Sequence, residues 1–479
     1  MIDSLLSMYD TQYTRTIVYM LQSTEYAPGP YLKWLWRTKN FHNIMHRRTL
    51  EMTRPARMLL LALRLGIILE LIVGLLLIYL DVSHHLVGGI EFGIALIVIY
   101  PIVWSHLIVV PLIVGKNIIS KPQANQLSVQ AEKIFTDHPG IKIAVAGSYG
   151  KTTMKELLKT VLGTVFEVAA TPANKNVAIS HAHFAKSLTG TEDILIIEYG
   201  EGAPGDVAAF ARTTHPTHAV ITGLAPAHLD HYKTLEAAGT DIFSVADYVQ
   251  NDMVYVYTEG KAVEPFLKPA FETFDASGSL GWKTKNVVVS VSGTTFELVK
   301  GSQTISLKSG LIGKHQVGYL AFVAAFGLSL GMKQSQVKSA IEQTVPFTHR
   351  MQPYALSGAW IIDDTYNGNL EGIRAGTEVL HTIDARRKVY VTPGLVDQGA
   401  ETEPVHVKMG KLIAAAKPDL VVLMKNSVTD YIKFGLDSAH YKGELRIEED
   451  PLEFYTNLPQ FVASGDLVVM QNDWPDNYY

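Results

Sequence analysis

A glycine-rich stretch with a lysine and two threonines offers the clearest chemistry in this chain. It reads Gly147-Ser148-Tyr149-Gly150-Lys151-Thr152-Thr153. Glycines at 147 and 150 let backbone N–H groups approach phosphate oxygens closely, where a Cβ would obstruct them. The lysine can reach terminal phosphates as a cation, and the hydroxyl of Thr152 is placed to ligate Mg²⁺. The stretch therefore predicts a phosphate-binding loop in which every residue except Tyr149 contacts a nucleotide.

The neighbours of this loop support the prediction. The apolar run Ile143–Ala146 precedes it as a strand, and Met154–Leu162 follows as an amphipathic helix whose N-terminal dipole favours an anion. The general pattern for such loops has a glycine where this chain has Val145, so the shortened form G-[ST]-x-G-K-[ST] fits better. A chance Gly-Lys-Thr turn is the alternative, and the flanking strand and helix argue against it.

Further polar groups follow predicted strands, at the edge where open α/β sheets bind ligands. They are Thr171–Asn176 after Phe166–Ala170, Glu198 after Asp193–Ile197, His228 after His218–Thr222, and Asp363–Asn369 after a strand at Ala359–Asp363. A carboxylate beside a phosphate-binding loop usually holds Mg²⁺, so we expect Glu198 to share the metal with Thr152. The position of His228 alone says little, because His218 and His231 lie nearby.

The elements that must position these groups alternate from Ile141 onward as strand, loop and helix, which predicts an α/β fold with a mainly parallel sheet. Asn286–Leu307 alternates apolar and polar residues around Ser292-Gly293 and predicts a β-hairpin. Leu320–Leu330 predicts a helix. A second α/β block follows, with strands expected at Ala359–Asp363, Lys388–Thr392, Leu420–Met424 and Asp466–Met470.

Two apolar runs precede the α/β region. Met58–Leu80 and Gly88–Gly115 are each long enough to cross a hydrocarbon core of about 30 Å as a helix. The connector Asp81–Val87 holds no lysine or arginine, whereas basic residues precede the first run and follow the second. This asymmetry predicts a transmembrane hairpin with both ends in the cytoplasm. A pair of buried or interfacial helices is the alternative, which Arg64, Glu70 and two prolines keep open.

Length and composition exclude some classes of function and some kinds of site. The chain has 479 residues and a formal net charge of −5, so no nucleic-acid partner is expected. Cysteine is absent, which excludes disulfides and thiolate metal sites. We expect a basic and aromatic cytoplasmic segment at 1–57, two transmembrane helices at 58–115, a linker with a short helix at 116–140, and α/β domains at 141–344 and 345–479.

The order of these motifs resembles the Mur ligase family, closest to the branch that adds D-alanyl-D-alanine to a UDP-muramoyl peptide. The resemblance covers roughly residues 140–479. It rests on Gly147–Thr153, Thr171–Asn176, Ile197-Glu198, Ala227-His228-Leu229, Gly313-Lys314-His315, His349-Arg350, Asp363–Asn369 and Val391–Val396. It implies a phosphate-loop central domain and a Rossmann-like C-terminal domain, here preceded by a membrane hairpin where the family has a UDP-sugar-binding domain.

The resemblance also implies roles for single residues. Lys151, Arg350, His228 and Asn176 would serve catalysis, with Asn174 and Asn176 at the junction of nucleotide and substrate carboxylate. Thr152 and Glu198 would bind one Mg²⁺, and His228 would bind a second. The remaining nucleotide contacts would come from His315, Arg350, Asp364, Tyr366 and Asn367.

The chain departs from the family at several of these places. The family often has a carbamylated lysine where this chain has Gly239, and Asp241 is a candidate substitute as a bridge between metals. The adenine-contacting His-Asn pair reads His315-Gln316, and a second family asparagine is replaced by Tyr319.

The reaction implied is ATP-dependent activation of a carboxylate as an acyl phosphate, followed by attack of an amine. The expected partners are ATP, Mg²⁺, a carboxylate-bearing envelope precursor (lipid-linked or UDP-linked), an amino acid or dipeptide, and the lipid bilayer. The protein is expected in the cell membrane as a multi-pass protein with cytoplasmic catalytic domains. Two alternatives remain: a ligase of the polyglutamate capsule type, and a degenerate ligase that serves as a membrane scaffold.

Overall fold

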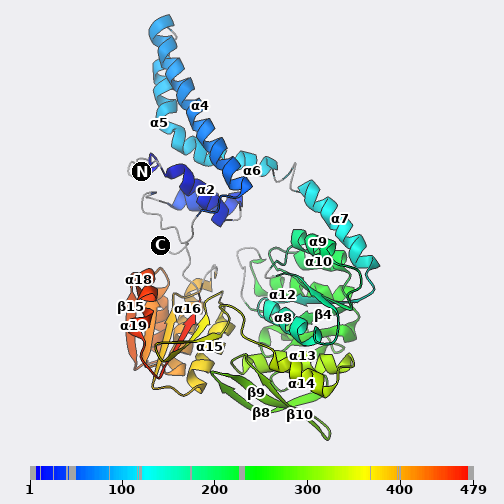
Figure 1. Ribbon diagram of the computed structural model, residues 1–479. Coiled ribbons are helices and arrows are strands. Elements are labelled where there is room, and N and C mark those ends of the chain that lie inside the picture. Colours follow the sequence, from blue (N-terminus) through cyan, green and yellow to red (C-terminus); the bar gives the residue numbers. More distant parts are fainter. Residues whose placement is uncertain are drawn as a thin grey trace. The chain divides into compact units, whose positions relative to one another are not determined.

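The computed structural model of the chain (Figure 1) describes residues 7–10, 12–24, 26–38, 41, 50–85, 87–115, 117, 121–172, 175–225, 232–366, 368–395, 398 and 401–472. The chain divides into two compact units, Met1–Gln126 and Leu127–Tyr479. The described part of the first unit is helical, and the second unit carries two β-sheets.

Two long apolar helices dominate the first unit. Helix α4 spans Arg54–His84, and α5 spans Gly89–Leu107 and is followed by the short α6 at Val109–Gly115. Helices α4 and α5 lie side by side as a hairpin (Figure 1), and glycines line their contact. A Cβ on Gly93 would come within 2.5 Å of the backbone oxygen of Gly74. The backbones thus approach closely along the contact, and most of the large apolar side chains face outward.

A small core closes one end of this hairpin. Helices α2 (Tyr13–Ser23) and α3 (Pro28–Arg37) bury aromatic and aliphatic side chains against the beginning of α4 and the end of α5. The hydroxyl of Tyr31 donates a hydrogen bond of 2.8 Å to the backbone oxygen of Ser105. The indole N–H of Trp36 donates to a ring nitrogen of His106 at 3.0 Å. These contacts tie the N-terminal helices to the hairpin.

The second unit begins with a ten-stranded sheet in the order β10-β9-β8-β7-β6-β5-β4-β1-β3-β2. Strands β1 to β6 are joined by parallel pairs, and the extension from β6 to β10 is antiparallel. The strands are β1 Ile141–Ala146, β2 Val168–Ala170, β3 Ile194–Glu198, β4 His218–Ile221, β5 Val254–Tyr257, β6 Glu272–Asp275, β7 Gly278–Ser279, β8 Trp282–Ser290, β9 Gly293–Lys300 and β10 Gln303–Ser309.

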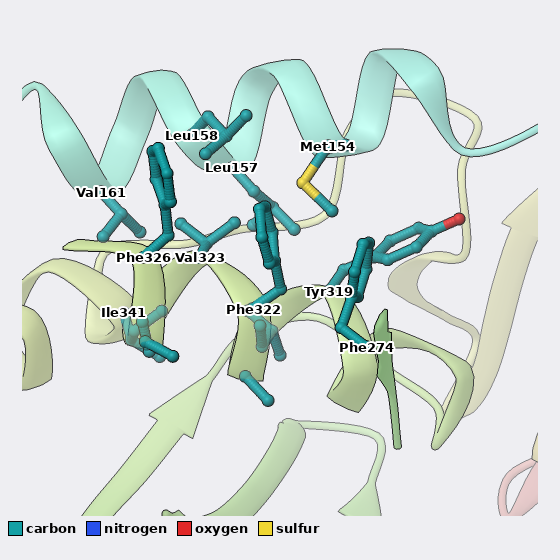
Figure 2. Packing of buried hydrophobic residues seen from close by; sticks show 14 of the residues in the cluster. Met154, Leu157, Leu158, Val161, Phe274, Tyr319, Phe322, Val323, Phe326 and Ile341 are labelled. Atoms are coloured by element: carbon teal, nitrogen blue, oxygen red, sulfur yellow. The ribbon is translucent and has the colours of Figure 1, made fainter. Parts of the chain in front are cut away.

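Helices cover this sheet and form its core. They are α8 Lys151–Leu162, α9 Ala178–Ser187, α10 Asp206–Thr214, α12 Leu235–Phe243, α13 His315–Ser329 and α14 Gln334–Glu342. Figure 2 shows α8 packed on a row of rings that includes Phe274, Phe322 and Phe326. Tyr319 stands at the end of this row near Met154, with its hydroxyl pointing away from the other rings. The core therefore extends up to the beginning of α8.

A six-stranded sheet follows in the order β11-β12-β16-β13-β14-β15, parallel except for β11. Its strands are β11 Gln352–Leu356, β12 Ala359–Asp364, β13 Arg387–Thr392, β14 Leu420–Met424, β15 Glu444–Glu448 and β16 Asp466–Gln471. Its helices are α15 Leu370–Thr382, α16 Thr402–Ala416, α17 Thr429–Ser438, α18 Pro451–Thr456 and α19 Leu458–Phe461.

Most predicted elements are confirmed, with two differences. The central sheet is only half parallel, because the predicted hairpin at Asn286–Leu307 belongs to a longer antiparallel extension. The short helix expected in the linker is longer than predicted, because α7 spans Lys121–Asp137 and has 17 residues. Ala131 and Phe135 on this helix are buried in the core of the ten-stranded sheet, so its C-terminal half is part of the second unit.

Candidate nucleotide site

The predicted phosphate-binding loop connects β1 to the first turn of α8. Gly147 and Gly150 have positive φ angles of 140° and 74°, which favour glycine. A Cβ on Gly150 would lie 2.1 Å from the hydroxyl of Tyr319, and one on Gly147 would lie 2.4 Å from that of Thr222. Both glycines are thus required by conformation and by space. The backbone N–H of Ser148 donates to the backbone oxygen of Gly223 at 2.9 Å, which fixes the loop on the end of β4.

Lys151, the first residue of α8, is held by two oxygens. Its ammonium group donates to the backbone oxygen of Gly147 at 2.5 Å and to the carboxylate of Glu201 at 2.6 Å. The side chains of Lys151 and Glu201 are 12% and 5% exposed, so this ion pair is largely withdrawn from water. The lysine thus lies folded back over its own loop.

Glu198 contacts side chains in the first two turns of the same helix. The hydroxyl of Thr152 donates to one carboxylate oxygen of Glu198 at 3.0 Å, and the amide of Asn176 approaches that oxygen at 3.5 Å. The ammonium group of Lys155 lies 3.2 Å from the other oxygen, and this lysine is completely buried. The structure therefore brings together three predicted residues, Thr152, Asn176 and Glu198, and adds Lys155.

Buried neighbours fix the end of β3 that carries Glu198. Thr171 accepts the backbone N–H of Glu198 at 3.0 Å, and a ring nitrogen of His181 lies 2.8 Å from the backbone oxygen of Glu198. Burial lowers the pKa of His181 to about 4, despite the opposing effect of that backbone contact. His181 is therefore neutral at pH 7 and donates to the carbonyl as an uncharged imidazole.

The oxygen donors at this point suit Mg²⁺. A threonine hydroxyl and a carboxylate oxygen share one spot at the N-terminus of α8, with an asparagine amide beside them. Hard cations of this size prefer such oxygen ligands and retain several waters, so two protein ligands suffice. No cluster of three or more His, Asp or Glu side chains that could hold a metal occurs among the described residues.

Aromatic side chains stand beside the loop. The hydroxyl of Tyr319 donates to the backbone oxygen of Thr222 at 2.9 Å, and that of Tyr257 donates to Glu259 at 2.9 Å. His315, a predicted nucleotide contact, begins α13, and burial lowers the pKa of its ring to about 4. One nitrogen of His315 lies 2.8 Å from the side-chain nitrogen of Gln316. His315 is thus uncharged near neutral pH and suits a neutral ligand better than a phosphate.

The C-terminal residues predicted to contact the nucleotide form a second group. The guanidinium of Arg350 lies 4.3 Å from the ring centre of Tyr366. Asp364 accepts hydrogen bonds from the side chain of Gln471 at 2.7 Å and from the backbone N–H of Met351 at 3.1 Å. Burial raises the pKa of Asp364 to about 7, although both hydrogen bonds and Arg350 oppose the shift. These contacts assemble Arg350, Tyr366 and Asp364 at the end of β12.

Several predicted residues give less information. Asn174, His228 and Asn367 lie outside the described residues. Thr153 is buried in α8, which leaves its predicted contact with the nucleotide without support from this geometry.

Asp241 does not suit the bridging role considered for it. One of its carboxylate oxygens accepts from the hydroxyl of Tyr232 at 2.7 Å and the other from the backbone N–H of Gly205 at 2.7 Å. A Cβ on Gly239 would lie 2.3 Å from the ring of Phe266, so a side chain at 239 has no room. Asp241 acts here as a structural acceptor between two loops.

The sequence reading missed Glu201 and Lys155. A weak signal existed, because Glu201 follows Glu198 by three residues after a strand, and Lys155 lies one helical turn beyond Lys151. Neither position reveals its partner without the fold, since each pair joins segments far apart in the chain.

Comparison with known proteins agrees with this geometry. Residues 145–326 match the Mur ligase middle domain. The chain is 27% identical over 364 residues to UDP-N-acetylmuramoyl-tripeptide D-alanyl-D-alanine ligase of Mycobacterium leprae, covering 69% of this chain and 70% of the relative. The Escherichia coli K12 ligase of the same name is 27% identical over 296 residues, covering 59% of this chain and 64% of the relative.

Solved structures show the same fold. MurF ligase from Thermotoga maritima in complex with ADP superposes with a TM-score of 0.63 at 23% identity, covering 73% of this chain and 80% of that chain. MurF from Acinetobacter baumannii superposes with a TM-score of 0.63 at 20% identity, covering 73% and 77%. The chain thus spans roughly two thirds to four fifths of these relatives.

Proposed function

We propose that this chain, whose residues 145–326 match the Mur ligase middle domain, is a membrane-anchored ligase of the Mur type. It uses ATP and Mg²⁺ to join a carboxylate to an amine in cell-wall peptide synthesis. The observation that carries the proposal is the constellation at the start of α8. There a glycine loop, Lys151, Thr152 and the carboxylate of Glu198 meet within hydrogen-bonding distance.

The proposed chemistry needs no nucleophilic side chain. A carboxylate oxygen of the substrate attacks the γ-phosphorus of ATP, forms an acyl phosphate and releases ADP. The amine then attacks the acyl carbon, forms the amide, releases phosphate and gives up a proton. Both steps bring anionic groups together, so the protein must neutralise charge and hold the reactants in line.

The side chains of this chain can meet those needs. Lys151 at the N-terminus of α8 would bind the terminal phosphates, together with the loop amides. Thr152 and Glu198 would hold Mg²⁺, which supplies charge neutralisation to the triphosphate when bound. Asn176, 3.5 Å from Glu198, would orient the substrate carboxylate. Arg350 and its neighbours at the end of β12 would reach the nucleotide when the C-terminal domain closes.

Exposed apolar surface supports the membrane anchor. Helices α4 and α5–α6 are long and apolar enough to cross a membrane by length and composition, and most of their surface is not covered within the protein. The end of the hairpin that joins α2 and α3 carries exposed Arg54 and Arg57, whereas residues 81–91 at the other end include Asp81 and Glu91 and contain no lysine or arginine. This asymmetry supports a hairpin whose basic end faces the cytoplasm, where ATP is available.

The location at a membrane favours a substrate built there. The relatives named above are ligases of a UDP-N-acetylmuramoyl tripeptide and D-alanyl-D-alanine. For this chain we propose a carboxylate-bearing envelope precursor, and a lipid-linked form would share the two-dimensional location of the anchor. The amine partner is an amino acid or a dipeptide.

The test is phosphate release from ATP by the purified, detergent-solubilised chain. Carboxylates (muramoyl peptides, free and lipid-linked) and amines (amino acids and dipeptides) are offered singly and in pairs. The proposal predicts release that requires both partners and a product whose mass equals their sum minus water. ATP binding without stimulated release by any pair would favour a scaffold, and repeated addition of one amino acid would favour a polymerising ligase.

A further inference from the structure

The lysine that should bind phosphate is already paired with an anion. Lys151 donates to Glu201 at 2.6 Å and to the backbone oxygen of Gly147 at 2.5 Å, so two of its three N–H groups are used inside the protein. Glu201 is 6% exposed and lies in the loop after β3, three residues beyond Glu198. The ammonium group therefore has only one N–H left for a triphosphate while it keeps both partners.

The pairing has a regular arrangement along α8. Glu201 contacts Lys151, while Glu198 contacts Thr152 and, one turn further, Lys155. Two carboxylates from one end of β3 thus neutralise the cations of the first two turns of the helix. Glu198 contacts a completely buried lysine, whereas Glu201 contacts Lys151, the lysine of the loop itself.

An arriving triphosphate competes directly with Glu201. Both are anions that seek the same ammonium group, and a carboxylate left within a few ångströms of phosphate oxygens repels them in a poorly hydrated site. Nucleotide binding must therefore break the Lys151–Glu201 pair and move the carboxylate away.

We infer that Glu201 pairs with Lys151 when no nucleotide is bound and is displaced when the triphosphate binds to this lysine. Glu201 therefore limits nucleotide affinity. This inference rests on the proposed function only in taking residues 147–153 as the nucleotide site. It makes Glu201 a specific determinant of affinity, because the carboxylate favours the empty state and contributes nothing to the loaded one.

Glu201→Gln tests this directly, because it keeps the shape of the side chain and removes its charge. Binding of ATP to the full-length, detergent-solubilised chain is measured by calorimetry in EDTA, so that Mg²⁺ does not mask the contact between lysine and phosphate. The expected result is a Kd for ATP at least about tenfold lower than that of wild type. The Tm of the empty protein should fall, since a buried lysine loses its partner, and ATP should raise the Tm by more than in wild type.

Two further variants isolate the cause. Asp206→Asn is the matched control, because Asp206 lies on the same segment and carries the same charge but accepts from the backbone N–H of Ala203 at 2.8 Å. Its Kd should equal that of wild type, which excludes a general effect of charge. In a Lys151→Met background, Glu201→Gln should give no gain, because the effect acts through this lysine.

The outcomes separate this inference from the proposed function. Unchanged or weaker ATP binding by Glu201→Gln, with wild type binding normally and the variant folded by circular dichroism, overturns the displacement of Glu201 and leaves the ligase untouched. A gain that persists in the Lys151→Met background also overturns it. Absence of ATP binding by wild type removes the nucleotide site itself and with it the proposed function.

Discussion

The two units of this chain differ in which side chains are buried and which are exposed. In the second unit, Lys155 is completely buried and paired with Glu198, and strands such as β3 and β14 are buried throughout. In the first unit, the side chains of Leu69 and Phe92 are 62% and 71% exposed. Arg54 and Arg57 are exposed in the first turn of α4. The second unit buries its apolar side chains, as proteins in water do, whereas the described helices α4 and α5 leave most of theirs exposed.

The difference teaches where each function must reside. A site that binds a polyanion needs cations held in place by a rigid framework, which the sheet and α8 supply. The apolar surface of α4 and α5, with arginines at one end, offers no such framework. Its chemistry is compatible with a hydrocarbon layer that has anionic headgroups. These features support our proposal that the chain joins a nucleotide site to a membrane anchor.

Removal of residues 1–115 should separate these two properties completely. Loss of the hairpin takes away the exposed apolar surface, so we expect the remaining protein to stay in the supernatant after ultracentrifugation without detergent. ATP affinity should match that of the full chain. A well-expressed fragment that pellets or that loses ATP binding would show that the apolar helices belong to the core of the second unit.

Lys151→Ala should have the next largest effect. Loss of the only loop cation should lower ligation at least about 10²-fold, comparable to removal of a single transition-state donor. Lys159→Ala is the matched control, because Lys159 lies exposed on the same helix. Steady-state phosphate release measures both variants. Equal turnover for wild type and Lys151→Ala, with circular dichroism unchanged, would remove this loop from the reaction.

Lys155→Met tests how strongly the second unit depends on its buried charges. The substitution leaves the Glu198 carboxylate without its cation inside the protein, and loss of one partner from a buried pair costs about 3–5 kcal/mol. Urea unfolding of the soluble fragment measures the loss, and Lys159→Met serves as the exposed control. A loss below about 1 kcal/mol, typical of exposed ion pairs, would contradict the burial described here.

Asp364 predicts a smaller effect that depends on pH. Because burial raises its pKa to about 7, the folded protein takes up a proton on acidification from pH 8 before the unfolded chain does. Asp364 therefore contributes stability as the pH falls through 7, by up to about 1.4 kcal/mol per pH unit.

Asp364→Asn should lack this gain. The quantity to compare is the difference in unfolding free energy between wild type and variant from pH 8 to pH 6, obtained from urea titrations. His181 and His315 act in the opposite direction, because their lowered pKa values disfavour the folded state as the pH falls below about 6.5. Both histidines are present in the two proteins and cancel in the comparison. A difference independent of pH would place the pKa of Asp364 in its ordinary range.

The sequence predicted the elements whose signals are local. The glycine pattern of 147–150 and the apolar runs of β1, β3 and β4 need no tertiary information, and the structure confirms them. The strands β5, β6, β7, β11 and β15 were not predicted from the sequence. Strand β7 has only two residues, and β15, Glu444–Glu448, is short and has only two apolar residues, Leu445 and Ile447. A short helix was predicted within 116–140, but the full extent of α7 was not, because only its C-terminal half packs against a core.

The candidate site shows the same limit. The sequence predicts that Thr152 and Glu198 lie together, because a carboxylate at a strand end beside a phosphate-binding loop commonly holds Mg²⁺. The contacts of Lys151 with Glu201 and of Lys155 with Glu198 depend on the register of α8 against the end of β3. The sequence pattern does not show how α8 is aligned with the end of β3. These two pairs could therefore be identified only from the structure.

The most direct test of the central claim follows an oxygen atom. The carboxylate substrate found by the phosphate-release screen is labelled with ¹⁸O on both oxygens, and the phosphate formed with ATP and the amine is analysed by mass spectrometry. Activation as an acyl phosphate predicts that each phosphate carries one ¹⁸O from the carboxylate, because the amine displaces the oxygen that bridged carbon and phosphorus. Phosphate without label would show that the carboxylate never attacked ATP, and it would contradict the assignment of this chain as a ligase of this type.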